Sequence, residues 1–178
     1  MAKIVLVTGG SRSGKSRHAL RLAESLGLRR AFVATCPPLD VEMKARIARH
    51  QADRAATGWD TIEEPIEIAR VLAEDKTHDV LLVDCLTLWI SNLMHEARPA
   101  GRRISEDDVS RLAGELLAAC RARAGVVIFV ANEVGLGVVP AKAAARLFRD
   151  LSGRCNQTIA AGADSVVLIT CGLPLTLK

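Results

Sequence analysis

The chain has 178 residues, of which 49% are hydrophobic and 25% charged, a balance typical of one globular domain with a buried core. The formal net charge of +4 suits a partner that is either an anionic small molecule or a nucleic acid. Aromatic residues make up only 3%, too few to build the stacking surface that single-stranded nucleic acid requires. We therefore predict a single domain, residues 1–178, that binds a small anion and no nucleic acid.

The apolar segments and the cysteines indicate where the protein works. The longest apolar run, AGVVIFVA at residues 124–131, is far shorter than the roughly 18–20 residues of a membrane span. The N-terminal KIVLVT is likewise too short for the core of a signal peptide. The 5 cysteines are odd in number and lack Cys-x-x-Cys spacing, which argues against a disulfide framework or a zinc site. These features predict a cytoplasmic protein with no membrane span.

Strand-like and helix-like segments alternate along the chain. Strands are expected over residues 3–8, 30–34, 79–84, 125–131 and 164–170, and helices over 15–26, 41–57, 106–124 and 141–161. Apolar strands that alternate with helices predict an α/β fold, with a mostly parallel sheet covered by helices on both faces. Segments 79–84 and 125–131 show no two-residue alternation and are expected at the centre of the sheet. Residues 94–105 are expected to form a surface loop that ends at the helix start SEDD.

The first expected strand is followed by the sequence GGSRSGKS. Its residues are Gly9, Gly10, Ser11, Arg12, Ser13, Gly14, Lys15 and Ser16. The spacing fits the phosphate-binding motif G-x-x-x-x-G-K-[ST], and the segment lies between a strand and a helix as that motif requires. Backbone N–H groups would surround phosphate oxygens, Lys15 would reach the β- and γ-phosphates, and Ser16 would bind Mg²⁺. The alternative, a glycine-rich turn without function, does not explain why a strand precedes the segment and a helix follows it. We predict a nucleoside triphosphate site.

Asp84 ends the apolar segment VLLVD. A carboxylate at the carboxyl end of a parallel strand faces the ligand crevice, where it can hold Mg²⁺ directly or through water. The same residue could instead cap a helix that begins near Leu86. The sequence leaves both interpretations open.

A second candidate site lies in the segment EMKARIARHQADR. Arg46, His50 and Arg54 recur at intervals of four residues, so a helix would place them on one face. The two arginines would disfavour protonation of His50 and keep a nucleophilic imidazole available, and they could also bind phosphates. A lone helical histidine is usually a surface or core residue without chemistry. The sequence therefore leaves two interpretations of His50: a catalytic nucleophile, or a surface or core residue without a chemical role.

The C-terminal third is dense in polar residues. Asn132 and Glu133 follow an apolar strand and should lie at the crevice edge, and Pro140 is expected in the first turn of the next helix. The helix that follows carries Arg146, Arg149, Asp150, Arg154, Asn156 and Gln157. Six such polar residues are too many to be explained by a solvent-exposed helix face alone. For any single one of them, simple exposure to solvent remains an alternative.

Taken together, the motifs resemble a known family. GGSRSGKSRHA, RI-x-x-H, VDCLTLWISNL, NEVGLGVVP and RLFRDLSGRCNQTIAAGAD resemble the bifunctional adenosylcobinamide kinase/adenosylcobinamide-phosphate guanylyltransferases of cobalamin biosynthesis. The resemblance covers residues 4–178. The phosphate motif alone is generic, whereas NEVG-x-G-[IV]-VP followed by RD-x-x-G-x-x-NQ is specific.

The resemblance implies a RecA-like P-loop NTPase fold and a homotrimer. It implies phosphorylation of adenosylcobinamide with ATP or GTP, then transfer of GMP from GTP through a covalent GMP-histidine, here His50, to give adenosylcobinamide-GDP. The implied catalytic residues are His50 and Lys15, with Ser16 and Asp84 as Mg²⁺ ligands. The implied nucleotide contacts are residues 9–16 and Ala34, Thr35, Cys36, Gln51, Ala52, Asp53, Arg54, Glu63 and Asp84.

This chain departs from the family pattern at three places. Cys36 stands where members often have serine, Leu20 where they have glutamate, and Ala55 where they have proline. None of these changes removes a reacting group. Two other functions remain to be compared: a P-loop kinase or NTPase for another small metabolite, with His50 structural, and a DNA-associated ATPase.

Overall fold

The structure is a computed structural model, and it describes residues 1–27, 29–37, 57–99 and 101–178. The helix expected over residues 41–57, with the exception of Thr57, lies outside the described residues. The same is true of Arg46, His50, Gln51, Ala52, Asp53 and Arg54.

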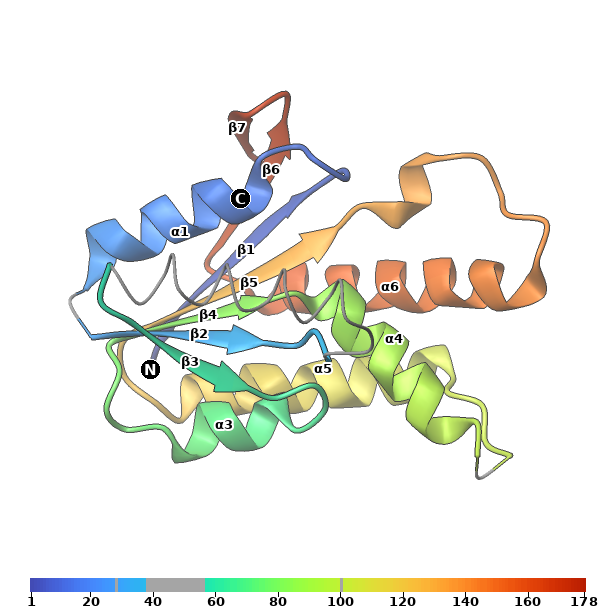
Figure 1. Ribbon diagram of the computed structural model, residues 1–178, viewed down its shortest axis with the longest axis horizontal. Helices are drawn as coiled ribbons and strands as arrows, with labels where there is room; N and C mark the ends of the chain where they lie inside the picture. Colours follow the sequence, from blue (N-terminus) through green and yellow to red (C-terminus); the bar gives the residue numbers. More distant parts are fainter. Residues whose placement is uncertain (28, 38–56, 100) are drawn as a thin grey trace.

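The described chain forms a 7-stranded sheet in the order β3-β2-β4-β5-β1-β6-β7 (Figure 1). The strands are β1 (Lys3–Gly9), β2 (Arg30–Ala34), β3 (Trp59–Glu63), β4 (Val80–Asp84), β5 (Val126–Asn132), β6 (Ser165–Thr170) and β7 (Leu173–Thr176). Every neighbouring pair is parallel except β6 and β7, which are antiparallel. The expected parallel sheet is confirmed, and the two apolar segments without alternation form the inner strands β4 and β5.

Helices cover both faces of the sheet. They are α1 (Lys15–Leu26), α3 (Ile68–Glu74), α4 (Leu86–Ala97), α5 (Glu106–Arg121), α6 (Ala143–Gly162) and a short 3₁₀ helix η1 (Val134–Leu136). Among the described elements, α1 lies on one face, and α3, α5 and α6 lie on the other together with the start of α4 (Figure 1). The start of α5 is a capping box, because Ser105 Oγ accepts from the Asp108 N–H and Asp108 accepts from the Ser105 N–H.

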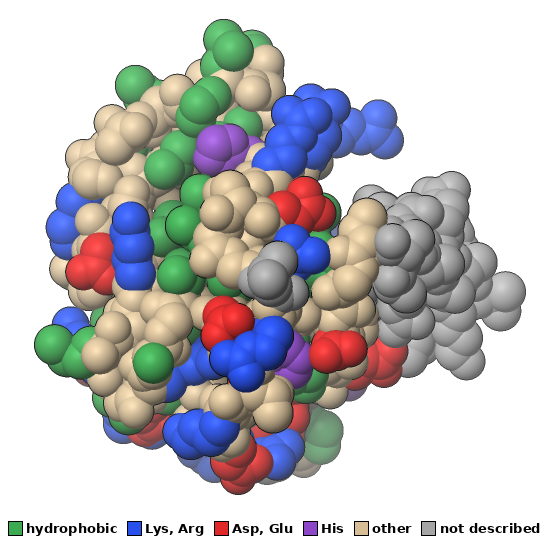
Figure 2. All heavy atoms as spheres, turned by 90° about the vertical axis from the view of Figure 1, so that its left-hand side faces the viewer, with side chains coloured by type: hydrophobic (Ala, Val, Ile, Leu, Met, Phe, Trp, Pro, Cys, Tyr) green, Lys and Arg blue, Asp and Glu red, His purple; other side chains and the backbone are tan. Residues whose placement is uncertain are grey.

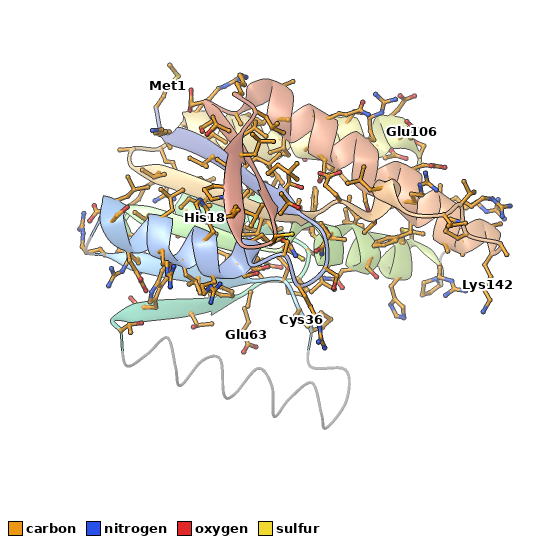
Figure 3. The ribbon with its side chains drawn as sticks, turned by 90° about the horizontal axis from the view of Figure 1, so that it is seen from above. Met1, His18, Cys36, Glu63, Glu106 and Lys142 are labelled. Carbon is orange, nitrogen blue, oxygen red and sulfur yellow. The ribbon has the colours of Figure 1, made fainter. Side chains whose placement is uncertain are left out.

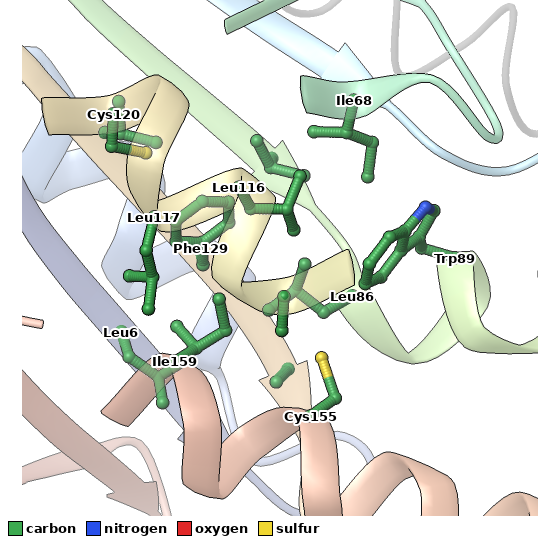
Figure 4. Packing of buried hydrophobic residues seen from close by; sticks show 14 of the residues in the cluster. Leu6, Ile68, Leu86, Trp89, Leu116, Leu117, Cys120, Phe129, Cys155 and Ile159 are labelled. Atoms are coloured by element: carbon green, nitrogen blue, oxygen red, sulfur yellow. The ribbon is translucent and has the colours of Figure 1, made fainter. Parts of the chain in front are cut away.

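The larger core lies between the sheet and the helices α3 to α6 (Figure 4). Leu6 and Phe129 from the strands meet Trp89, Leu116 and Ile159 from the helices, and each of these side chains is at most 2% exposed. Burying a side chain of this size contributes about 1.5–3 kcal/mol. Trp89 also donates from Nε1 to the carbonyl oxygen of Ile66 over 2.8 Å, which ties α4 to the chain before α3.

The structure corrects several expected boundaries. Residues 94–97 belong to α4, so the surface loop begins only after Ala97, and Pro140 precedes α6 by three residues instead of lying in its first turn. The sequence reading missed β3, α3 and β7. All four residues of β7 are exposed and β3 has only one buried residue, so neither strand carries the apolar pattern of an inner strand. The 5 cysteines, all within the described residues, lie outside any disulfide, as expected.

Within the described residues, no helix combines the length and the apolar character needed to cross a bilayer.

Candidate nucleotide-binding site

The carboxyl ends of the parallel strands bring the predicted residues to one edge of the sheet. In the strand register, Gly9 lies beside Asn132, and Ala34 lies between Glu63 and Asp84. These residues come from five strands that are separated along the sequence. Gly9, Ala34, Glu63 and Asp84 therefore lie along the carboxyl edge of the sheet, where parallel sheets bind ligands, and their nucleotide contacts remain predictions.

The segment of residues 9–16, the phosphate loop, has the backbone that its glycines predict. It joins β1 to α1, with positive φ angles of 157° at Gly9, 58° at Arg12 and 95° at Gly14. Gly14 is the N-cap of α1, and no side-chain hydrogen bond caps the first turn within the described residues. The N–H groups at the start of the helix are thus left for a ligand, and the positive end of the helix dipole favours an anion there.

The phosphate loop borders an open pocket of about 690 Å³ that is lined by Ser11, Arg12, Gly14, Lys15, Ser16 and Arg17. Lys15 reaches back across the loop, with its Nζ 3.3 Å from the carbonyl oxygen of Gly10. Among the described residues that line the pocket, Arg12, Lys15 and Arg17 are positively charged and none is a carboxylate. The pocket is therefore built for a polyanion such as a triphosphate.

Asp84 faces the same side of the sheet as α1. Along β4, Val80 and Leu82 pack in the cluster that includes Ala19 of α1, and Asp84 continues this alternation. The N-cap of α4 is Cys85, the residue after Asp84, so the interpretation of Asp84 as the cap of that helix is wrong.

The pKa of the Cys85 thiol depends on two charged side chains near it. Burial raises the pKa of Cys85 to about 11; the negative charge of Asp84 also raises it, whereas the positive charge of Lys15 lowers it. One thiol therefore lies within electrostatic range of both Asp84 and Lys15. This places the predicted metal ligand and the predicted phosphate-binding lysine in the same part of the site.

Thr35 has a different position from the one expected for a nucleotide contact. Its side chain is fully buried, and its Oγ1 donates to the Cys85 carbonyl over 2.9 Å and accepts from the Cys85 N–H over 2.7 Å. Asn92 also donates to the Thr35 carbonyl oxygen over 2.7 Å. The side chain of Thr35 therefore holds the ends of β2 and β4 together.

Cys36 and Glu63 lie at the ends of neighbouring strands, on one side of the ribbon in Figure 3. Their nucleotide contacts remain predictions. Gln51, Ala52, Asp53 and Arg54, and the candidate nucleophile His50, fall outside the described residues, so the structure does not place them relative to the phosphate loop.

Behind the phosphate loop lies a hydrogen-bond network that sequence reasoning found only in part. Thr8 Oγ1 donates to Glu133 Oε1 over 2.5 Å, and Asn156 Nδ2 donates to the same oxygen over 3.0 Å. The Glu133 N–H donates to the Gly9 carbonyl oxygen over 3.1 Å. Asn132 and Glu133 were expected at the crevice edge and Asn156 was singled out only as one of many polar residues on its helix, whereas Thr8 was missed. A polar residue at the end of an otherwise apolar strand was the available signal.

The polar residues of α6 differ in their surroundings. Arg154 Nε donates to Glu106 over 2.9 Å, and Arg146 donates to the carbonyl oxygens of Pro140 and Ala141, but these bonds lie at the surface. The solvated-face interpretation therefore stays open for Arg146 and Arg154. It is wrong for Asn156, whose bonds to Asn132 and Glu133 are partly buried.

Comparison with solved structures supports the fold. The chain is similar to an ATPase from the type III secretion system of pathogenic bacteria, with a TM-score of 0.58 and 11% identity over 98% of this chain and 56% of that one. It is also similar to the RadB recombinase, with a TM-score of 0.50 and 18% identity over 93% of this chain and 73% of that one. These likenesses show a RecA-like P-loop fold.

Comparison by sequence is more specific. The chain is 44% identical to the bifunctional adenosylcobalamin biosynthesis protein CobP of Pseudomonas aeruginosa, over 97% of this chain and 96% of the relative. It is 38% identical to the corresponding protein CobU of Salmonella typhimurium, over 98% of this chain and 99% of the relative. The family model described as cobinamide kinase / cobinamide phosphate guanyltransferase matches residues 5–177. The chain therefore belongs to the cobinamide kinase / cobinamide phosphate guanyltransferase family.

Proposed function

We propose that this cobinamide kinase and cobinamide phosphate guanylyltransferase of cobalamin biosynthesis carries out two nucleotide-dependent steps at the carboxyl edge of its sheet. The observation that carries the proposal is the phosphate loop, with Lys15 3.3 Å from its own loop carbonyl and Asp84 on the same side of the sheet, in a member of this family. The substrates are adenosylcobinamide, its phosphate, and ATP or GTP.

In the first step, the hydroxyl oxygen of adenosylcobinamide attacks the γ-phosphorus of ATP or GTP, and the nucleoside diphosphate leaves. The N–H groups of residues 9–16 and the start of α1 hold the β- and γ-phosphates, and Lys15 neutralises the charge that develops between them. The transfer needs positioning and electrostatic stabilisation, and no covalent protein intermediate.

Mg²⁺ fits the residues present. The Ser16 hydroxyl and the Asp84 carboxylate are oxygen donors of the kind that Mg²⁺ prefers, and both belong to the edge that holds the phosphate loop. The described residues contain no cluster of three or more histidine, cysteine, aspartate or glutamate side chains that could hold a metal alone. This agrees with an ion that also takes phosphate oxygens as ligands. When bound, it would neutralise phosphate charge.

In the second step, we propose that His50 carries GMP. A nitrogen of its imidazole attacks the α-phosphorus of GTP and pyrophosphate leaves; a phosphate oxygen of adenosylcobinamide phosphate then attacks the same phosphorus, and the imidazole leaves. Arg46 and Arg54 would keep the imidazole neutral and bind phosphate oxygens. The phosphoramidate suits this role, because imidazole is both a nucleophile and, once protonated, a good leaving group. The products are pyrophosphate and adenosylcobinamide-GDP.

We also propose that residues 1–178 act as one domain in a cytoplasmic homotrimer. A corrinoid is large compared with the open pocket of about 690 Å³ at the phosphate loop, and sites for large ligands often lie between subunits. Each corrinoid site would then be shared by neighbouring chains. Light scattering should find a trimer, and a fully active monomer would contradict this proposal.

The test compares His50→Asn with His95→Asn, a change at an exposed histidine on α4. After incubation with α-³²P-GTP, the wild type and His95→Asn should carry an acid-labile, base-stable label, and His50→Asn should carry none. All three should still phosphorylate adenosylcobinamide.

The other outcomes are informative. A label on His50→Asn would place the nucleophile elsewhere, with His18 on α1 the next residue to test (Figure 3). Loss of both activities in folded His50→Asn would mean that His50 serves a nucleotide pocket common to both steps. A wild type that transfers γ-phosphate but never carries GMP would favour a kinase of another small metabolite.

A further inference from the structure

We propose that the side chain of Arg17 binds the α-phosphate of the nucleotide and takes part in the transfer of GMP, the step in which the α-phosphorus reacts. The inference deepens the proposed function and rests on it, with the nucleotide of both steps held by the phosphate loop. Arg17 follows this loop directly on α1, and the two proposed steps give its side chain no role.

The guanidinium of Arg17 lies where the phosphate loop meets the turn between β6 and β7. Its Nη2 is 4.0 Å from the position that a Cβ atom would take on Gly14, and 4.0 Å from the same position on Gly172. Gly172 lies in that turn, and its N–H donates to the carbonyl oxygen of Ser13 over 2.9 Å. The β6–β7 hairpin stands beside the loop between β1 and α1 (Figure 1). Arg17 also lines the open pocket at the loop, so its charge lies next to a bound polyanion.

The order of the strands puts Arg17 and Asp84 on opposite sides of the phosphate loop, which continues from β1. On one side of β1 lie β5 and then β4, which ends in Asp84, and on the other side lie β6 and β7. The guanidinium of Arg17 lies beside the β6–β7 turn. It therefore meets the end of the polyphosphate that points away from Asp84.

The start of α1 assigns the α-phosphate to this end. The helix begins with a hydrogen bond from the His18 N–H to the Gly14 carbonyl oxygen, over 3.0 Å. The Arg17 N–H therefore has no acceptor within the helix and points out of its N-terminal end. Because residues 9–16 hold the β- and γ-phosphates in the proposed site, the next free N–H along the chain, that of Arg17, meets the next phosphate. This phosphate is the α-phosphate, and the guanidinium of the same residue lies at its side.

The two proposed steps use the α-phosphate differently. In the kinase step, the bond between the γ-phosphorus and its bridging oxygen breaks, and the α-phosphate does not react. In the GMP step, a nitrogen of His50 bonds to the α-phosphorus while the bond to the bridging oxygen breaks, and pyrophosphate leaves with the electron pair. A guanidinium that donates to the non-bridging α-oxygens stabilises the charge at the reacting phosphorus in this step alone.

The side chain of Arg17 is available for this contact. In the part of the chain that the structure describes, no hydrogen bond or ion pair engages its guanidinium, and no carboxylate lines the pocket beside it. The planar guanidinium can donate two parallel N–H bonds to two oxygens of one phosphate, whereas a lysine ammonium acts as a single point charge. Arg21, one turn further along α1, is also exposed but is not among the residues that line the pocket, so it provides a matched control.

Phosphorus NMR of bound β,γ-imido-GTP tests the contact without any reaction. Arg17→Ala should move the resonance of the α-phosphorus and leave those of the β- and γ-phosphorus near their wild-type positions. It should also weaken binding of the analogue by about 5- to 10-fold, as expected for a lost hydrogen bond between charged groups. Arg21→Ala should change neither the spectrum nor the affinity.

Rates at saturating nucleotide test the catalytic role. Arg17→Ala should slow labelling by α-³²P-GTP by about 10- to 100-fold and slow ATP-dependent phosphorylation of adenosylcobinamide by less than about threefold. Arg17→Lys should label at an intermediate rate, because it keeps the charge and loses the paired donors. Arg21→Ala should match the wild type in both assays.

The inference is overturned if folded Arg17→Ala labels like the wild type, loses both activities by the same factor, or leaves the α-phosphorus resonance unmoved. Should Arg17→Ala unfold, Arg17→Lys decides in its place. A wild type that binds the analogue but never carries GMP would refute the covalent histidine step; the role of Arg17 is then decided by the α-phosphorus resonance and by the rate of adenosylcobinamide-GDP formation. A wild type that does not bind the analogue would refute the nucleotide site and this inference together.

Discussion

A Cβ atom built on Gly9 would lie 2.4 Å from the carbonyl oxygen of Ile169, on the neighbouring strand β6. It would also lie 2.7 Å from Ser13 Oγ inside the phosphate loop, and the φ angle of Gly9 is positive. Around the Cβ position of Gly10, the next residue, no atom of the described chain beyond its two neighbours lies within 4 Å. Two adjacent glycines of the same motif therefore differ: the first has no space for a side chain and the second has.

We expect Gly9→Ala to lower the free energy of unfolding by about 2 kcal/mol, because a backbone carbonyl of the sheet would have to move. Gly10→Ala should change it by less than about 0.5 kcal/mol. Urea unfolding of the two variants measures both values. Equal stabilities would show that the end of β1 can shift and that the contact with Ile169 is not restrictive.

Lys15→Ala should slow both nucleotide-dependent steps by about 100-fold or more, because the charge on the β- and γ-phosphates loses its closest ammonium group. Lys76→Ala, at an exposed lysine beyond α3, is the control. The measurements are ATP-dependent phosphorylation of adenosylcobinamide and labelling by α-³²P-GTP. Labelling of Lys15→Ala at the wild-type rate would refute the assignment of residues 9–16 as the phosphate-binding loop.

Thr35→Val should lower the free energy of unfolding by about 2 kcal/mol, because the Cys85 N–H and carbonyl would lose their shared buried partner. Valine keeps the shape of threonine, so no cavity forms. Thr176→Val in the exposed strand β7 should have little effect. Denaturant unfolding distinguishes the two, and an unchanged stability of Thr35→Val would show that other donors can replace the hydroxyl.

A histidine at the opposite edge of the sheet predicts a dependence of stability on pH. His78 Nδ1 lies 2.6 Å from Asp75 Oδ2 and its Nε2 lies 2.9 Å from Asp60 Oδ2. Figure 2 views this edge, where acidic and basic side chains intermingle. Burial lowers the pKa of His78, but the hydrogen bonds and charges of the two carboxylates outweigh it and raise the pKa above the ordinary value.

A pKa that folding raises means that the protonated form favours the folded state. The stabilisation by His78 should be complete below its unfolded pKa, about 6.5, and disappear as the pH rises through the higher folded value. The wild type should therefore lose stability relative to His78→Gln as the pH rises above about 6.5 and through the folded pKa, as urea unfolding at each pH can measure. Parallel profiles of the two proteins would contradict the prediction.

The sequence by itself determined the elements whose signals are local. The apolar segments of β4 and β5 predict inner strands because burial on both faces requires apolar side chains at every position. The phosphate loop can be predicted from its sequence because Gly9 and Gly14 have positive φ angles, which glycine adopts readily. This preference is local and does not depend on the rest of the chain. The strand β7 was not predicted from the sequence, because an exposed edge strand needs no apolar pattern.

The tertiary structure alone decided which side chains share the site. Thr8 and Glu133 are 125 positions apart, and their hydrogen bond exists only because β5 inserts between β4 and β1. The same pairing places Asn132 between Gly9 and Asp84, on the face that α1 covers. No local signal encodes this neighbourhood, because the order of parallel strands is set by how the whole sheet buries its two faces, and the side chains at the strand ends follow that order.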